Sequence, residues 1–310
     1  MKNPARLTFA LAAISYAQTV PAFRSNVDLV TIPCTVVDAS GAAVDGLTRD
    51  DFRVYDNGVR RILTNFWVDT ERPLVLGVII DASDSQHEQL AEHRQTALDL
   101  LDRFLRPGDQ AFVISVDSEV RLWADLSGSL ADLHRQLDAH PGALFGQPCP
   151  TKQSNVPGLK PVPVCGSSPL WDTIYDAARL KLRPLAGSKA LLILTDGFDS
   201  GSLRTWREAA NETHRAEAAV YAIQYRSAFG GSFAPDFLRL VSEAGGAVFS
   251  PPRGEYRPLV SRIETDLRRR YVLGFRPERL GGKIRHEVLV EVTRPELTVR
   301  ARKAYFEVPQ

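Results

Sequence analysis

The sequence predicts an α/β fold: a doubly wound, mostly parallel sheet with helices on both faces, plus a small β-sandwich-like unit built from the two ends of the chain. Three observations predict it. Apolar runs of strand length alternate with helical stretches in the middle of the chain, and strand-like alternation without helices occupies both ends. The 310 residues, 44% hydrophobic and 24% charged, are enough for about two domains with a sizeable core.

The chain begins with a segment typical of an export signal. Lys2 and Arg6 precede an apolar run that ends at Ala17, and Ser15 and Ala17 have the spacing of a signal-peptidase site. We interpret residues 1–17 as a signal peptide and expect an exported protein: periplasmic, on the cell surface or secreted. The run is shorter than the roughly 20 residues of a spanning helix, so no stable membrane span is expected after cleavage. An apolar first strand and a membrane anchor are the alternatives.

Residues 26–70 and 271–310 are the two β segments. Period-two alternation in VDLVTIPCTVVD and in FRVYDNGVRRILTNFW predicts antiparallel strands, with a hairpin turn at DNG. Cys34 lies within this alternation, so we interpret it as a buried strand thiol. Because each segment alone is too small to hold a core, we expect the two to pair into one sandwich, with residues 71–255 inserted between them.

The inserted part, residues 71–255, is predicted to be the α/β domain. Its strand-like runs are LVLGVII, QAFVISV, KALLILT and AVYAIQY, and stretches with helical periodicity such as HEQLAEHRQTALDLLDRFL lie between them. Such alternation is typical of a parallel sheet covered on both faces. The basic run Arg268, Arg269 and Arg270 closes the last helical stretch. We interpret it as complementing the carbonyl-rich helix end rather than as an anion site.

Polar residues directly follow two of the apolar strands. LVLGVII ends at Asp81, with Ser83 and Ser85 beyond it, and ALLILT is followed by Asp196 and Gly197. In a doubly wound sheet, ligands bind at the carboxyl ends of the strands, so these groups converge if the two strands are parallel neighbours. Carboxylate and hydroxyl oxygens are the ligands of Mg²⁺, Ca²⁺ or Mn²⁺ rather than of zinc or copper.

These two motifs, Asp-x-Ser-x-Ser after the first strand and Thr-Asp-Gly after a later one, resemble the signature of von Willebrand factor A (VWA) domains with a metal-ion-dependent adhesion site. The resemblance covers roughly residues 73–250, and the flanks resemble a bacterial group of exported VWA-related proteins with β extensions at both ends. It implies a third loop with a Thr just before a helix. Ser168 stands at that place, with a hydroxyl whose χ1 is less restricted.

The resemblance also implies roles for these residues. Ser83, Ser85 and Ser168 would bind the cation directly, and Asp81 and Asp196 would bind it directly or through water. The cofactor is then Mg²⁺, with Ca²⁺ or Mn²⁺ as alternatives, and an Asp or Glu of a protein partner fills the open sixth position. The expected function is adhesion or assembly without catalysis. The alternative for these residues is turn and helix-cap chemistry, which for Ser168 is an N-cap.

The alternative function is a metal-assisted or serine hydrolase. The sequence lacks Gly-x-Ser-x-Gly, a phosphate-binding Gly-x-x-x-x-Gly-Lys loop and His-Glu-x-x-His. No two histidines are spaced i,i+4, so no general base is identified. Most of the six histidines are expected on the solvated surface: His87, His93, His134, His140, His214 and His286.

The net charge argues against one class of partner, and the two remaining cysteines indicate a possible disulfide. The 38 basic and 37 acidic residues leave a formal charge of +1 and no sustained positive field, which argues against nucleic acid as a partner. Cys149 and Cys165 flank a stretch rich in Pro, Gly and Ser. A disulfide between them fits an exported protein and would stabilise the fold by about 3 kcal/mol on the chain-entropy model.

Overall fold

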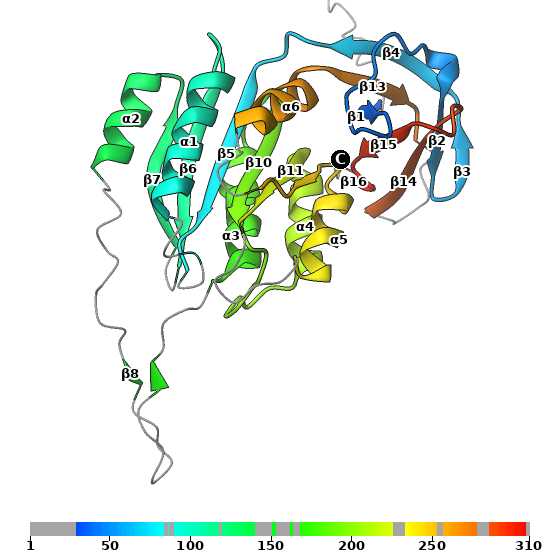
Figure 1. Cartoon of the computed structure of the whole chain (residues 1–310). Coiled ribbons are helices and arrows are strands. Elements are labelled where there is room, and N and C mark those ends of the chain that lie inside the picture. Colours follow the sequence, from blue (N-terminus) through cyan, green and yellow to red (C-terminus); the bar gives the residue numbers. More distant parts are fainter. Residues whose placement is uncertain are drawn as a thin grey trace, which may run out of the picture.

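The computed structural model contains an α/β domain and a β-sandwich, which lie side by side in Figure 1 with the sandwich on the right. It describes residues 29–83, 86, 90–117, 120–139, 151–152, 162–163, 168–225, 233–252, 257–277 and 285–307. The predicted signal peptide, residues 1–17, and both Cys149 and Cys165 lie outside the described residues.

The α/β domain is built on a six-stranded sheet of order β12-β11-β10-β5-β6-β7. Its first five strands in this order pair in parallel, and β7 is antiparallel to β6. The strands are β5 (Leu74–Asp81), β6 (Gln110–Val116), β7 (Val120–Ser127), β10 (Ser188–Thr195), β11 (Ala218–Gln224) and β12 (Val248–Phe249). The predicted doubly wound, mostly parallel sheet is therefore confirmed.

Helices cover both faces of this sheet. One face carries α1 (Leu90–Phe104), α2 (Leu130–Asp138) and α6 (Arg257–Arg268). The other carries α3 (Leu170–Asp176) with its π-helical continuation Ala177–Leu182, α4 (Trp206–Ala216) and α5 (Pro235–Glu243). Because successive side chains of a strand point to opposite faces, the apolar strands bury residues on both sides. Among the described helices, none is long and apolar enough to cross a membrane.

The order of strands reverses between β5 and β10. From β5 the sheet continues through β6 and β7 on one side, whereas β10, β11 and β12 extend it on the other. Ligands of doubly wound sheets bind at such a switch point, at the carboxyl ends of the strands. The two strands pair in parallel with Ile80 opposite Leu194. The residues that follow both strands are therefore neighbours.

The sandwich consists of two four-stranded sheets, of order β15-β1-β13-β4 and β16-β14-β2-β3. Strands from the two ends of the chain pair with each other, since β1 lies between β13 and β15, and β2 pairs with β14. The strands are β1 (Val30–Val37), β2 (Phe52–Asp56), β3 (Val59–Arg61), β4 (Leu63–Asp69), β13 (Arg270–Phe275), β14 (Arg285–Val292), β15 (Thr298–Ala301) and β16 (Ala304–Phe306). A separate hairpin pairs β8 (Thr151–Lys152) with β9 (Val162–Pro163).

Apolar residues of both sheets meet in one core within the sandwich. Cys34 belongs to this core and is 1% exposed, which confirms the interpretation of a buried strand thiol. The turn between β2 and β3 places Asn57 at φ 49° and Gly58 at φ 80°, the left-handed conformations that a two-residue hairpin turn requires.

One expectation from the sequence is wrong. Buried positions are occupied by His93, His214 and His286, whereas we expected most histidines on the surface. The basic run complements the end of α6 as expected, since Nε of Arg270 donates to the Asp266 backbone oxygen, but Arg268 and Arg270 are also buried. Both findings have the same physical cause: these polar side chains also bond to groups on other elements, which sequence periodicity does not show.

Candidate metal centre

Asp81, the last residue of β5, is fully buried at the switch point. Its Oδ1 accepts a hydrogen bond from the Ser83 backbone N–H at 3.1 Å, and its Oδ2 accepts one from the Thr195 hydroxyl at 2.6 Å. The Asp81 backbone oxygen lies 3.1 Å from Nδ1 of His93. Contacts on both strands therefore fix this carboxylate at the edge of the sheet.

Asp196 directly follows β10 and is 3% exposed. Its Oδ1 accepts from the Phe198 backbone N–H at 3.2 Å, and its Oδ2 accepts from Nε2 of Gln86 at 2.9 Å. Gly197 adopts φ 81° and donates its N–H to the Thr195 hydroxyl oxygen at 2.9 Å. Since the same hydroxyl donates to Asp81, Thr195 links the Thr-Asp-Gly loop to the end of β5.

Ser168 lies in the third loop, two residues before α3. Its backbone pairs with that of Ser200. The Ser168 N–H donates to the Ser200 backbone oxygen at 2.8 Å, and the Ser200 N–H donates to the Ser168 backbone oxygen at 3.0 Å. Ser168 is 3% exposed, and its buried Oγ has no hydrogen-bond partner among the described residues. Because buried hydroxyls nearly always have a partner, this orphaned oxygen points to a ligand.

The loop that follows Asp196 is fixed to the first turn of α3. The carboxylate of Asp199 accepts from the Trp171 N–H at 3.0 Å. The carboxylate of Asp172 accepts from the Leu203 N–H at 2.9 Å, and the Asp172 N–H donates to the Ser202 hydroxyl at 3.2 Å. Both carboxylates thus serve turn and helix-end chemistry. The loops that carry Ser168 and Asp196 form one connected unit.

The electrostatics of the edge favour a bound cation. The pKa of Asp81 is raised to about 6: burial is the largest cause and the nearby charge of Asp196 also raises it, whereas hydrogen bonds from Ser83 and Thr195 lower it. Within the described parts of the chain, no cationic side chain forms an ion pair with Asp81. A divalent cation would supply the missing positive charge and would lower the pKa of Asp81, opposite to the effect of burial.

The residues present fit a hard divalent cation. The described donors at this edge are the carboxylates of Asp81 and Asp196 and the hydroxyls of Ser83 and Ser168, and all of them are oxygens. No group of three or more His, Cys, Asp or Glu side chains in the described ranges could hold a metal. A site here therefore depends on hydroxyl donors. The further predicted donor, Ser85, lies outside the described residues.

Sequence reasoning missed three polar residues around this edge. Thr195 is part of the Thr-Asp-Gly motif but was assigned no role, and Gln86 gave no signal. Burial lowers the pKa of His93 to about 3, so its ring is neutral and Nδ1–H donates to the Asp81 backbone oxygen. A signal for His93 was present, because Leu90, His93 and Ala97 share one helix face that is buried.

No family model matches the chain, and no curated protein matches it. Solved structures do match. One is proximal thread matrix protein 1 from the mussel byssus, whose metal-ion-dependent adhesion site (MIDAS) motif is occupied by zinc. It is 16% identical over 67% of this chain and 48% of that chain, with a TM-score of 0.49. The chain thus spans about half the length of that protein.

Two further matches cover most of the other protein. The conserved hypothetical protein BatB from Bacteroides thetaiotaomicron is 13% identical over 62% of this chain and 98% of that chain, with a TM-score of 0.41. The SpRpn10 VWA domain is 11% identical over 60% of this chain and 90% of that chain, with a TM-score of 0.38. At this identity, the zinc and the names belong to those proteins alone. Of these three solved structures, the SpRpn10 protein is named as a VWA domain and the mussel protein is named for its MIDAS motif.

Proposed function

We propose that the chain is a protein-binding module that holds one divalent cation, Mg²⁺ in the first place, and uses it to bind an acidic residue of a protein partner. One observation carries the proposal. At the switch point of the sheet, the buried carboxylates of Asp81 and Asp196 lie at the ends of neighbouring strands, and Ser168, joined to the same loops, has a buried hydroxyl with no partner among the described residues.

In this proposal, the hydroxyls of Ser83, Ser85 and Ser168 bind the cation directly, and Asp81 and Asp196 bind it directly or through water. The neutral hydroxyls leave positive charge on the cation, so an anionic ligand is favoured at its open position. A carboxylate of the partner meets this requirement, because hard cations prefer carboxylate oxygens. The cation supplies the attraction, and the chain's residues hold it in place and position the open side.

The connected loops matter for affinity. The loop after Asp196 is tied to α3 through Asp172 and Asp199, so it does not have to order when a partner binds. Pre-organisation of this kind lowers the entropic cost of association. No step in the proposal needs a nucleophile or a general base, so the module acts by binding. The charge and apolar order of the first residues support an exported location in this proposal.

Calorimetric titration of the purified chain with Mg²⁺, Mn²⁺ and Ca²⁺ tests the cation site. We expect saturable binding of one ion, lost in Asp81→Ala and in Asp196→Ala. The matched control is Asp138→Ala, since that carboxylate is 73% exposed and lies at the end of α2. Far-UV circular dichroism confirms that each variant is folded. A folded wild type that binds no cation, or equal binding by all four proteins, refutes the proposal.

The partner chemistry is tested with immobilised synthetic peptides that contain a central Asp or Glu. We expect binding in Mg²⁺ that is lost with a chelator and lost when the acidic residue is replaced by Asn or Gln. Binding that survives the chelator, or that is equal for Asn and Gln peptides, contradicts recognition through the cation.

A further inference from the structure

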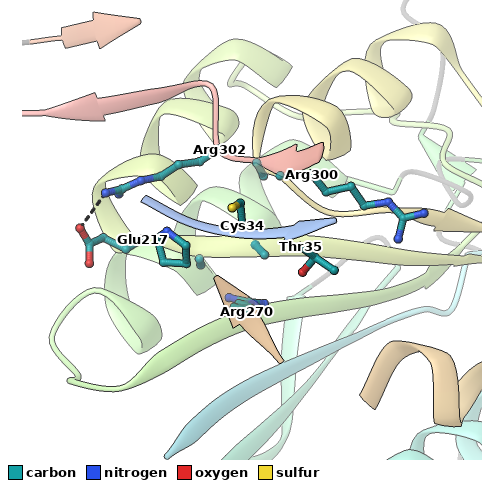
Figure 2. Close-up of a pocket in the computed structure, with 11 residues that line it drawn as sticks. Cys34, Thr35, Glu217, Arg270, Arg300 and Arg302 are labelled. Atoms are coloured by element: carbon teal, nitrogen blue, oxygen red, sulfur yellow. Dashed lines mark hydrogen bonds and ion pairs between the residues drawn. The ribbon is translucent and has the colours of Figure 1, made fainter. Parts of the chain in front are cut away.

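A second candidate site lies at the junction of the two domains, where a cavity of about 20 Å³ opens beside Cys34 (Figure 2). Its walls come from β1, the start of β11, the turn between α5 and β12, and the ends of β13 and β15. This volume holds a water molecule or a small ion. The charged side chains that line it are Glu217, Arg270, Arg300 and Arg302.

Two of the three arginines have a carboxylate partner. The Arg302 guanidinium pairs with Glu217 at 3.0 Å, and Figure 2 shows the two side chains pointing toward each other. The Arg300 guanidinium extends away from them in the same view and pairs with Asp266 at 2.5 Å. Arg270 forms no ion pair with any of the described residues. Its charge interacts with the Asp266 carboxylate, which already pairs with Arg300, so three arginines share two carboxylates and the junction carries an excess positive charge.

Arg270 is 6% exposed, and its guanidinium makes a side-chain hydrogen bond with Tyr221 and two long hydrogen bonds with other groups. Nε donates to the Asp266 backbone oxygen at 3.3 Å, and Nη1 donates to the Ser188 hydroxyl at 3.4 Å. Nη2 is buried without a partner among the described residues, and so is Nε of Arg302. Buried guanidinium donors without an acceptor, beside an excess of buried positive charge, are unfavourable, so this arrangement favours an anion.

Two other titratable neighbours of Arg270, Cys34 and Tyr221, supply no further negative charge. Burial raises the pKa of the Cys34 thiol, although the Arg270 charge lowers it, so the thiol stays neutral. Burial likewise raises the pKa of the Tyr221 hydroxyl, which is also neutral. A further cation, Lys189, interacts electrostatically with Glu217 and Arg302 and adds to the positive charge.

We propose that this cavity is a binding site for a small inorganic anion of the size of chloride, held by Nη2 of Arg270 and Nε of Arg302. The basic run at the end of α6 therefore includes an anion ligand, contrary to the interpretation from the sequence. The site is independent of the candidate metal centre. A bound anion satisfies the buried donors and stabilises the contact between the sandwich and the α/β domain.

Thermal unfolding of the full chain tests the proposal, with chloride replacing gluconate at constant ionic strength. We expect the melting temperature to rise saturably, by about 2–4 °C at tenfold excess over Kd. Arg270→Gln should lose this dependence. Arg269→Gln is the matched control, because Arg269 is the neighbouring residue and its side chain is 51% exposed. A wild type without a saturable chloride effect, or an equal effect in Arg270→Gln, overturns the proposal.

A second measurement covers the case in which Arg270→Gln does not fold. Crystals of the wild-type chain grown in bromide should show an anomalous-scattering peak in the cavity, within hydrogen-bond distance of Arg270 and Arg302. The absence of such a peak at saturating bromide overturns the proposal, whatever the variant does.

Discussion

Replacing His214 with Gln is expected to remove a large part of the protein's sensitivity to acid. His214 lies in α4 and is 2% exposed. Its Nε2–H donates to the Glu243 backbone oxygen at 2.8 Å, and its Nδ1 has no partner among the described residues. Burial is the main cause that lowers the pKa of His214 to about 4, from 6.5 for an ordinary histidine, and nearby arginines lower it further.

The sign follows from proton binding. Between the two pKa values the unfolded chain holds a proton on His214 that the folded chain does not, so acid favours unfolding. The stability associated with neutral His214 is complete above pH 6.5 and is lost as the pH falls toward 4. From about pH 7.5 to about pH 5, the loss in the free energy of unfolding is about 2 kcal/mol.

Urea unfolding at the two pH values measures this loss. Gln at position 214 can still donate to the Glu243 oxygen but does not titrate, so His214→Gln should lose about 2 kcal/mol less on acidification than the wild type. His134→Gln is the control, because His134 is on the exposed side of α2 and bonds to Asp102. Equal pH dependence in the wild type and His214→Gln refutes the reasoning.

Three more predictions concern the junction and the candidate metal centre. Gly245→Ala should lower the free energy of unfolding in urea by about 2 kcal/mol or more, because φ at this position is +75° and a Cβ would strike backbone atoms at the end of β15. Gly46→Ala is the control: φ is +77° but the space is open, so the loss should be only about 1 kcal/mol. Arg268→Gln should cost about 3–5 kcal/mol in the same assay, because it leaves buried Asp109 without its ion pair. Ser168→Ala should weaken the affinity for Mg²⁺, measured by calorimetry, about tenfold without loss of stability. Ser168→Thr, which keeps a hydroxyl, should bind Mg²⁺ with the affinity of the wild type.

The sheet could be predicted because its signal is local. Each central strand buries side chains on both faces and therefore appears as a continuous apolar run, with helical periodicity between the runs. The burial of Arg268 could not be predicted in the same way. Its partner Asp109 lies 159 residues earlier, and both groups are satisfied only after α6 packs beside the start of β6. Long-range polar pairs leave no periodic trace in the sequence.

The candidate metal centre also has some residues whose positions could be predicted from the sequence and others whose positions could not. Asp81 and Asp196 stand where apolar runs stop, so their place at the strand ends follows from the sequence. The position of Ser168 depends on its backbone pairing with Ser200, and this pairing has no signature in either loop. The bond from Gln86 to Asp196 is of the same kind, because it joins residues 110 positions apart.

The two proposed sites lie at opposite ends of β10, and this separation makes them electrostatically independent. Ser188, where the strand begins, bonds to Arg270, and Asp196 follows the other end. A strand of eight residues spans about 26 Å. At that distance and an effective dielectric constant of about 20, two unit charges interact by only about 0.6 kcal/mol, so a charge bound at one end has little direct effect at the other. The sandwich thus contacts the edge of the sheet opposite the candidate metal centre. Under the proposed function, a partner that binds the cation is expected to approach from the side away from this junction.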